Sequence, residues 1–212
     1  MTSAAAIDLI GVLAYGELVA FEGSGVDASR APTLRDKVEL GRIAAAEHRH
    51  FELLCAYLVD QGVDPLAAME PFVAAFDGFH DNMAPRDWLE GLMKTYVGDG
   101  IAADFYREIA GLLDADEAAI VLSVLDDSQE SAYVVDRIRD AIAADPSVGG
   151  RLALWGRRLM GEMISQGTLV AGSRPAMRAA LASRGAELDL GGLVNRLALS
   201  HGRRMDALGL AS

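Results

Sequence analysis

Carboxylate side chains stand on the apolar faces of four segments that the sequence predicts to be helical, and this feature limits the folds open to the chain. Glu17 continues an apolar row in the first segment, and Glu47 and His50 continue one in the second. Asp99 and Glu130 hold the corresponding places in the third and fourth. An isolated buried carboxylate loses several kcal/mol of hydration, and four that converge also repel one another. Divalent cations remove that conflict, so the pattern predicts a carboxylate-and-histidine metal site inside a helical bundle.

The spacing of these residues supports the same interpretation. Glu47 and His50 stand three residues apart, so they lie on one helix face and can reach one ion. Positions 17 and 47 are 30 residues apart, positions 99 and 130 are 31 apart, and a glycine precedes both Glu17 and Asp99. Such a repeat is expected of a site shared by two helical hairpins.

Helical periodicity of the apolar residues divides the chain into six predicted segments. They span residues 4–23, 33–61, 86–112, 115–144, 149–171 and 191–208. Breakers separate them at Gly23-Ser24-Gly25, at Gly62 with Pro65, and at Asp145-Pro146. We predict an all-α fold, in which a four-helix bundle of two hairpins is joined by a long crossover at about 65–85 and followed by two additional C-terminal helices.

Charge divides the chain near residue 148. Residues 1–148 carry 10 basic and 27 acidic side chains, whereas residues 149–212 carry 9 and 4. We predict that 1–148 is the metal-binding bundle and that 149–212 is a helical pair packed on the same domain. The C-terminal arginines either form a local phosphate-binding surface or dock onto the acidic bundle. They include Arg151, Arg157, Arg158, Arg174, Arg178, Arg184, Arg203 and Arg204.

Several classes of protein are disfavoured by composition. The net charge of −12 opposes non-specific binding to nucleic acid. The first basic residue is Arg30, so the N-terminus lacks the charged region of a secretory signal, and we expect no apolar run long enough to span a bilayer. One cysteine, Cys55, excludes an internal disulfide and a cysteine-rich zinc site. We expect a soluble, cytoplasmic protein without membrane contact, with a homodimer as one assembly.

The carboxylate and histidine positions resemble those of the ferritin-like di-iron carboxylate proteins. More narrowly, four stretches resemble the MiaE-like family of non-haem di-iron tRNA hydroxylases, which oxidise methylthio-isopentenyl-adenosine. These stretches are Leu13–Glu22, Ala46–Leu54, Tyr96–Ile109 and Ser128–Val135, and the resemblance covers about residues 5–145.

The resemblance implies a set of metal ligands. Glu17 matches a terminal ligand, Glu47 a bridging ligand and His50 the histidine of the first half-site. Asp99 matches a glutamate of the third helix and is one methylene shorter, while Glu130 matches the second bridging glutamate. These five residues are the expected ligands.

The second half-site departs from the family pattern. The histidine expected three residues after Glu130 is Tyr133. Tyr133 either binds the metal or is a core aromatic whose hydroxyl rests on a carboxylate. Asp127, one turn before Glu130, either supplies a replacement ligand or makes a hydrogen bond.

For function, the resemblance implies two iron ions, activation of dioxygen and insertion of oxygen into a carbon–hydrogen bond. It also implies an external electron donor and a tRNA or small-molecule substrate. One alternative is a degenerate ferritin-like protein with a partial metal site and a structural or partner-binding role. A third hypothesis is iron oxidation or storage as in ferritins.

Overall fold

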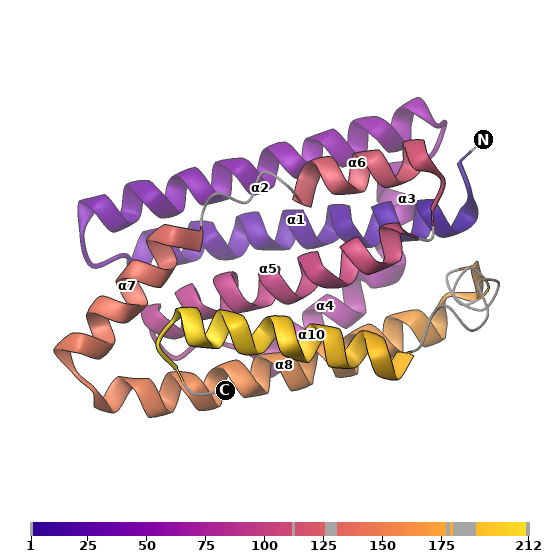
Figure 1. Cartoon of the computed structure of the whole chain (residues 1–212). Coiled ribbons are helices and arrows are strands. Elements are labelled where there is room, and N and C mark those ends of the chain that lie inside the picture. The colour runs from indigo at the N-terminus through magenta and orange to yellow at the C-terminus, as the bar shows by residue number, and fades with distance from the viewer. Residues whose placement is uncertain (1, 112, 126–130, 177–178, 180–189, 211–212) are drawn as a thin grey trace.

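The computed structural model describes residues 2–111, 113–125, 131–176, 179 and 190–210, which are helical almost throughout and include no strand. The helices are α1 (Ala4–Arg30), α2 (Leu34–Asp60), α3 (Pro65–Met69), the 3₁₀ turn η1 (Glu70–Phe72), α4 (Val73–Asn82), α5 (Trp88–Ala110), α6 (Ala115–Leu125), α7 (Ser131–Ala144), α8 (Ser147–Ser173) and α10 (Leu190–Ala207). Figure 1 shows most of them running side by side as an elongated bundle, which confirms the predicted fold class.

The hairpin of α1 and α2 forms one side of the bundle. Each helix begins at a side-chain cap, because the Ser3 hydroxyl accepts a hydrogen bond from the Ala6 amide and the Thr33 hydroxyl accepts one from the Asp36 amide. Only residues 31–33 separate the two helices, so they pack antiparallel along their whole length (Figure 1). This packing brings the middle of α1 opposite the middle of α2.

The predicted end of the first helix at Gly23-Ser24-Gly25 is wrong, because α1 continues to Arg30. A glycine inside a helix costs about 1 kcal/mol relative to alanine. Two residues of the last turns of α1 are nevertheless buried, with Ser24 1% and Asp27 7% exposed. Asp27 packs on α5, where a Cβ added at Gly91 would lie only 2.5 Å from the Asp27 Oδ1 atom. Tertiary packing therefore overrides the local preference for a break.

The crossover between the two halves of the bundle contains more helix than expected. Residues 65–85 include α3, η1 and α4, which carry the chain from the end of α2 to the start of α5. Phe72 is 1% exposed and anchors this segment in the core. The carbonyl of Ala68 lies so close to α1 that a Cβ added at Gly11 would overlap its oxygen, so only glycine fits there.

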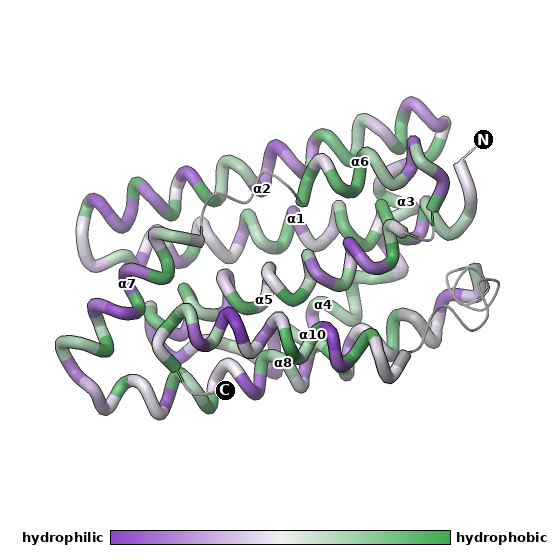
Figure 2. Tube along the Cα trace, in the orientation of Figure 1, coloured by the Kyte–Doolittle hydropathy of each residue, from purple (hydrophilic) through white to green (hydrophobic). Residues whose placement is uncertain are grey.

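The predicted fourth helix, 115–144, is described as two helices, α6 and α7, and residues 126–130 lie outside the described part. Apolar residues recur along every helix (Figure 2), and their buried side chains form two clusters. One cluster joins α1, α2 and α3 to the end of α5 and to α6. The other joins the start of α2 and most of α5 to α7, α8 and α10.

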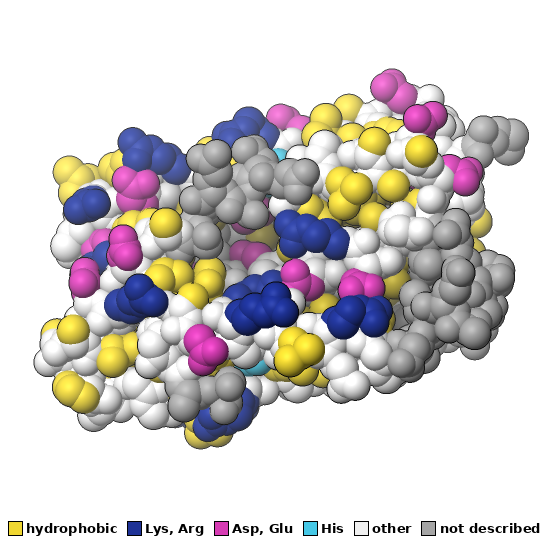
Figure 3. Space-filling view, viewed as in Figure 1, with side chains coloured by type: hydrophobic (Ala, Val, Ile, Leu, Met, Phe, Trp, Pro, Cys, Tyr) yellow, Lys and Arg dark blue, Asp and Glu magenta, His cyan; other side chains and the backbone are white. Residues whose placement is uncertain are grey.

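Arginines of the C-terminal helices pair with acidic side chains of the bundle. Arg151 of α8 contacts Glu90 at 2.6 Å and Asp87 at 2.7 Å. Arg174 pairs with the buried Asp8 of α1, and Arg204 of α10 pairs with Asp104 of α5. Figure 3 shows basic and acidic side chains interspersed on one face of the molecule. These contacts support docking over phosphate binding for Arg151, Arg174 and Arg204, whereas Arg178 and Arg184 lie outside the described residues.

The expectation that no apolar run is long enough to span a bilayer does not hold for helix α1. Its 27 residues pass that test by length and composition, with a mean hydropathy of 1.8 in the richest window. Half of that window is buried inside the bundle.

Two buried aspartates have opposite electrostatic environments, and this predicts opposite effects of neutralising them. Burial raises the pKa of Asp27 to about 6 from an ordinary 3.8, despite the positive charges of Arg30 and Lys94. The folded state therefore holds this proton more tightly than the unfolded chain does, which favours folding at low pH. That advantage is lost as the pH rises through about 6. We expect Asp27→Asn to raise the free energy of unfolding at pH 7.5 and to have little effect near pH 4.

Asp36→Asn is the matched control. Burial acts to raise the pKa of Asp36, but hydrogen bonds from Thr33 and Tyr133 and the charge of Arg137 hold it below its ordinary value. Its ionised form thus stabilises the fold at neutral pH, and this contribution is lost as the pH falls through its folded-state pKa. We expect Asp36→Asn to cost about 1–3 kcal/mol at pH 7.5, with the loss shrinking in acid. Chemical denaturation across pH 4–8 measures both, and an Asp27→Asn protein less stable than wild type at pH 7.5 contradicts the account.

Candidate metal centre

Three side chains from the middle of the α1–α2 hairpin meet inside the bundle. One ligand atom from each of Glu17, Glu47 and His50 lies within 4.8 Å of the others. The His50 Nδ1 atom is 3.3 Å from Glu17 Oε2. The side chains of His50 and Glu17 are only 13% and 11% exposed, and Glu47 is 9% exposed. The structure therefore brings together the three residues predicted for the first half-site.

Ordinary helix geometry explains why these side chains converge. Glu17 follows the buried Leu13 by one turn, and Glu47 follows the buried Ile43 by one turn, so both glutamates continue the inward face of their helices. His50, three residues after Glu47, projects from nearly the same face. Ile43 belongs to one hydrophobic cluster and Leu54 to the other, so the polar group lies at the boundary between the two.

The donor set of this cluster suits a metal ion. Two carboxylates that lie close together in a poorly hydrated interior repel each other, and a cation between them replaces that repulsion with attraction. Carboxylate oxygen together with imidazole nitrogen suits iron, manganese or zinc, whereas a hard ion such as Mg²⁺ prefers oxygen alone. The three residues thus fit a mixed oxygen and nitrogen site for a divalent first-row transition metal.

Tyr106 of α5 is the aromatic neighbour of this site. A Cβ added at Gly16, the residue before Glu17, would lie 3.7 Å from the Tyr106 hydroxyl oxygen. Tyr106 is 7% exposed, and burial together with the negative charge of Glu17 raises the pKa of its phenol. The phenol therefore stays protonated next to the carboxylates and helps to exclude water from them.

Asp99 does not face the core, so the predicted inward orientation of this residue is wrong. Its side chain is exposed, while Val97 and Ile101 are 0% and 2% exposed. Asp99 lies two residues from each of them, about 180° around the helix from the face that they share. As a metal ligand Asp99 stays a prediction, and it is not part of the cluster of Glu17, Glu47 and His50.

Tyr133 lies away from the cluster and bonds to a different carboxylate. Its hydroxyl donates a hydrogen bond of 2.7 Å to Asp36 Oδ1. Asp36 precedes Glu47 by 11 residues of α2, which is about 16 Å along the helix axis. Of the two alternatives for Tyr133, the structure therefore shows the second, an aromatic residue whose hydroxyl bonds to a carboxylate. The other second-site candidates, Asp127 and Glu130, lie outside the described residues.

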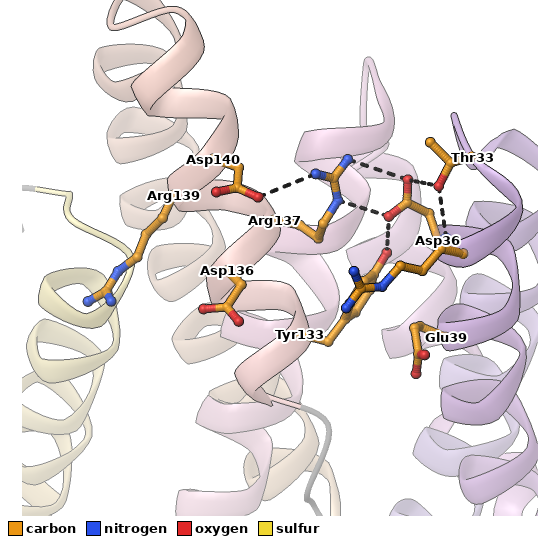
Figure 4. A pocket seen from close by; sticks show the side chains of 9 residues that line it. Thr33, Asp36, Glu39, Tyr133, Asp136, Arg137, Arg139 and Asp140 are labelled. Carbon is orange, nitrogen blue, oxygen red and sulfur yellow. Dashed lines mark hydrogen bonds and ion pairs between the residues drawn. The ribbon is translucent and has the colours of Figure 1, made fainter.

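A charged cavity of about 730 Å³ lies between α2 and α7, around this tyrosine (Figure 4). Arg137 spans it, with Nε 2.8 Å from Asp36 Oδ1 and Nη1 3.6 Å from Asp140 Oδ2. Its lining residues are Thr33, Arg35, Asp36, Glu39, Tyr133, Asp136, Arg137, Arg139 and Asp140. Acidic and basic side chains alternate in this lining, so the cavity is an ion-paired crevice and lacks the apolar walls usual for a small-molecule site.

Sequence reasoning missed several buried carboxylates that need no metal. Asp8, Asp36 and Glu90 are each 5% exposed or less, and an arginine pairs with every one of them. Glu117 is 6% exposed and accepts hydrogen bonds from the amide and hydroxyl of Ser3. For Asp8 and Glu90 the excess of arginine in the C-terminal region was the available signal. Buried acids need partners of opposite charge, and Arg174 and Arg151 are those partners.

Comparison with known proteins agrees with this architecture. A solved structure described as protein 19 with aldehyde deformylating oxidase activity, from Synechococcus, matches with a TM-score of 0.73 and 21% sequence identity. The match covers 98% of this chain and 93% of the other, and at this identity it shows the fold alone. No curated protein sequence matches the chain. Residues 2–184 match the family described as "Ferritin-like domain, actinomycetes", and the chain therefore belongs to that ferritin-like family.

Proposed function

We propose that this chain is a non-haem iron protein that activates dioxygen, with Glu17, Glu47 and His50 as ligands of its metal. The cluster of these three side chains within 4.8 Å is the observation that carries the proposal. Membership of a ferritin-like family supports it, as does a structural relative whose name includes an oxidase activity. The sequence resemblance to di-iron hydroxylases adds the expectation of a second iron, with Glu130 as its proposed ligand.

The chain's own residues would perform three tasks at this centre. Glu17 and Glu47 supply anionic oxygens that balance the charge of a divalent ion, and His50 supplies a neutral nitrogen donor. Tyr106 and the apolar residues around it keep bulk water away, which strengthens these charge interactions. When bound there, iron would supply the binding and reduction of dioxygen, with electrons from an external donor.

We propose a small molecule over tRNA as the substrate. Binding of tRNA depends on arginine and lysine side chains that are available to phosphates. Arg151, Arg174 and Arg204 instead pair with acidic residues of the bundle. The net charge of −12 acts in the same direction. A cytoplasmic location, where reduced electron donors are available, fits this proposal.

A protein with one metal and a structural or partner-binding role is the second candidate. Two observations favour it, namely the exposed side chain of Asp99 and the bonding of Tyr133 to Asp36. Asp99 was predicted as a ligand of the second half of a di-iron site, and metal binding was one of two alternatives for Tyr133. The number of metal ions per chain separates the two candidates.

Metal binding is predicted to stabilise the fold through the cluster. With Fe²⁺ or Mn²⁺ at 100 times its dissociation constant under anaerobic conditions, the gain is about 2.7 kcal/mol. For a chain of this size that corresponds to a rise of about 5–10 °C in the unfolding midpoint. We expect Glu47→Gln to abolish the rise. Glu52→Gln is the control, since that side chain is 68% exposed on the same helix and should leave the rise intact. If the metal raises the unfolding midpoint equally in wild type and in Glu47→Gln, the stabilising metal binds at another place.

Oxygen chemistry is predicted to require two irons per chain. We would load the protein anaerobically with Fe²⁺, count bound iron, and follow the absorption spectrum after adding dioxygen. Two irons that are lost together in Glu47→Ala, with an oxygen-dependent absorption change, support the enzyme. One iron without an oxygen response supports the second candidate, and less than half an equivalent of any metal rejects both.

A further inference from the structure

The basic side chains of the N-terminal part of the chain gather on one stretch of the α1–α2 hairpin. Residues 1–85 contain five of them, all between positions 30 and 49, namely Arg30, Arg35, Lys37, Arg42 and Arg49. Every one of the five is exposed. The same stretch contains three acidic residues, of which Asp36 and Glu47 are buried. The stretch is therefore a positively charged surface on a chain whose net charge is −12.

Three of these residues form a row on the outer face of α2. Arg35, Arg42 and Arg49 follow one another at intervals of seven residues, so they project from nearly the same side of the helix. Arg49 stands two residues after Glu47, which turns it about 200° around the helix from that buried carboxylate. The side chain of Arg42 is 69% exposed. Figure 3 shows basic side chains over the first half of α2, and we call these three arginines the basic row.

The basic row has no ion pair with another helix within the described part of the chain. Arg42 pairs with Glu39 of its own helix at 2.7 Å, and Arg49 donates a hydrogen bond to the Ala45 carbonyl one turn earlier. The paired arginines of the C-terminal helices differ, since Arg151 and Arg204 reach carboxylates of α5. The positive charge of the row is therefore directed at solvent and available to a partner.

Exposed apolar side chains accompany the basic row. Leu34 and Val38 stand one turn apart and are 78% and 45% exposed. Around the helix they lie between Lys37 and the row. Arginine beside exposed apolar side chains is typical of surfaces that bind proteins. A nucleic acid would need a more extensive positive surface, and a two-fold dimer through this face would bring two basic rows together. An acidic protein is the partner that fits.

The basic row lies on the same helix as two of the proposed metal ligands. Glu47 and His50 project from the inner side of α2. The main neighbours of α2 are α1, α3 and α6, and Figure 1 shows its first half at the edge of the bundle. A partner on the row is separated from the carboxylates by the thickness of α2, about 10–12 Å. Electron transfer slows steeply with distance, so this face suits an electron donor.

We propose that the basic row, together with Lys37, is the docking surface for a small acidic electron-carrier protein. The inference rests on the proposed function, which needs an external donor. One electron leaves the carrier, which is oxidised, and reduces a ferric ion at the carboxylate cluster to the ferrous form. At physiological ionic strength charges are screened beyond about 8 Å, so the row outweighs the net charge of the chain at this face. Opposite charges then steer and orient the encounter.

Cross-linking of carboxylates to amines tests the proposal, because the chain has only two lysines, Lys37 and Lys94. Lys37 is exposed, whereas Lys94 is partly buried with its Nζ atom 2.8 Å from His80 Nδ1. The probe is an acidic [2Fe–2S] ferredoxin whose carboxylates are activated with carbodiimide before the excess reagent is quenched. It would be mixed with the full-length protein, with and without iron, and mass spectrometry would locate the linked amine.

We expect the cross-link at Lys37 whether or not iron is bound, and its loss at high salt. The charge reversals Arg42→Glu and Arg49→Glu, made together, should reduce its yield at least ten-fold. Arg203→Glu is the matched control, since Arg203 is exposed on α10 and should leave the yield unchanged. Lys37→Arg keeps the charge but removes the amine, so it should abolish the cross-link while calorimetry still detects binding of the ferredoxin.

Three results would overturn the proposal. The first is a cross-link that forms at the N-terminal amine as readily as at Lys37. The second is an equal yield in the Arg203→Glu variant and in the variant with both reversals on α2. The third is a tRNA that binds through the basic row when the ferredoxin does not. Iron-loaded protein that responds to dioxygen after chemical reduction, yet gives no cross-link at Lys37, rejects the docking surface and leaves the proposed function intact.

Discussion

Two carboxylates placed face to face between α1 and α2 are the constraint on which the rest of this structure depends. The hairpin has a short connection and long antiparallel helices, so Glu17 and Glu47 meet wherever the apolar faces of the two helices pack. Moving either residue by one position would rotate its carboxylate by about 100° around the helix, away from the carboxylate of the other glutamate. The chain instead keeps both glutamates inward and adds His50 beside them. Such a group is stable as a metal centre and costly as a purely structural element.

Three other buried acids of the bundle are neutralised in a different way. Arg174 pairs with Asp8, Arg151 with Glu90 and Arg137 with Asp36, and each pair joins two helices. Two of these arginines belong to α8 or follow it directly, so the C-terminal helices balance the charge of the bundle as well as covering it. The contrast is informative about function. Acids with arginine partners are structural, whereas Glu17 and Glu47 lie together with a histidine, as a metal ligand set does.

The sequence predicted the convergence of Glu17, Glu47 and His50 because apolar residues one turn earlier, Leu13 and Ile43, set the inward direction of the two helices at these positions. The short connection between α1 and α2 then places the three side chains opposite one another. Prediction failed for Asp99 because α5 is packed by α1, α6, α8 and α10, so apolar residues surround much of its circumference. A helix buried on several sides gives a weak periodic signal, and the chosen row was displaced from the true one. The extension of α1 past Gly25 was also missed, since it depends on the contact between Asp27 and α5 and not on local preference.

Anomalous X-ray diffraction from crystals grown with iron tests the central claim most directly. Data collected on both sides of the iron absorption edge locate bound iron without assumptions about its ligands. The account predicts a strong anomalous peak within bonding distance of Glu17, Glu47 and His50, absent from crystals of Glu47→Gln. Iron bound only at other positions, or no peak between α1 and α2 in a fully loaded protein, would contradict it.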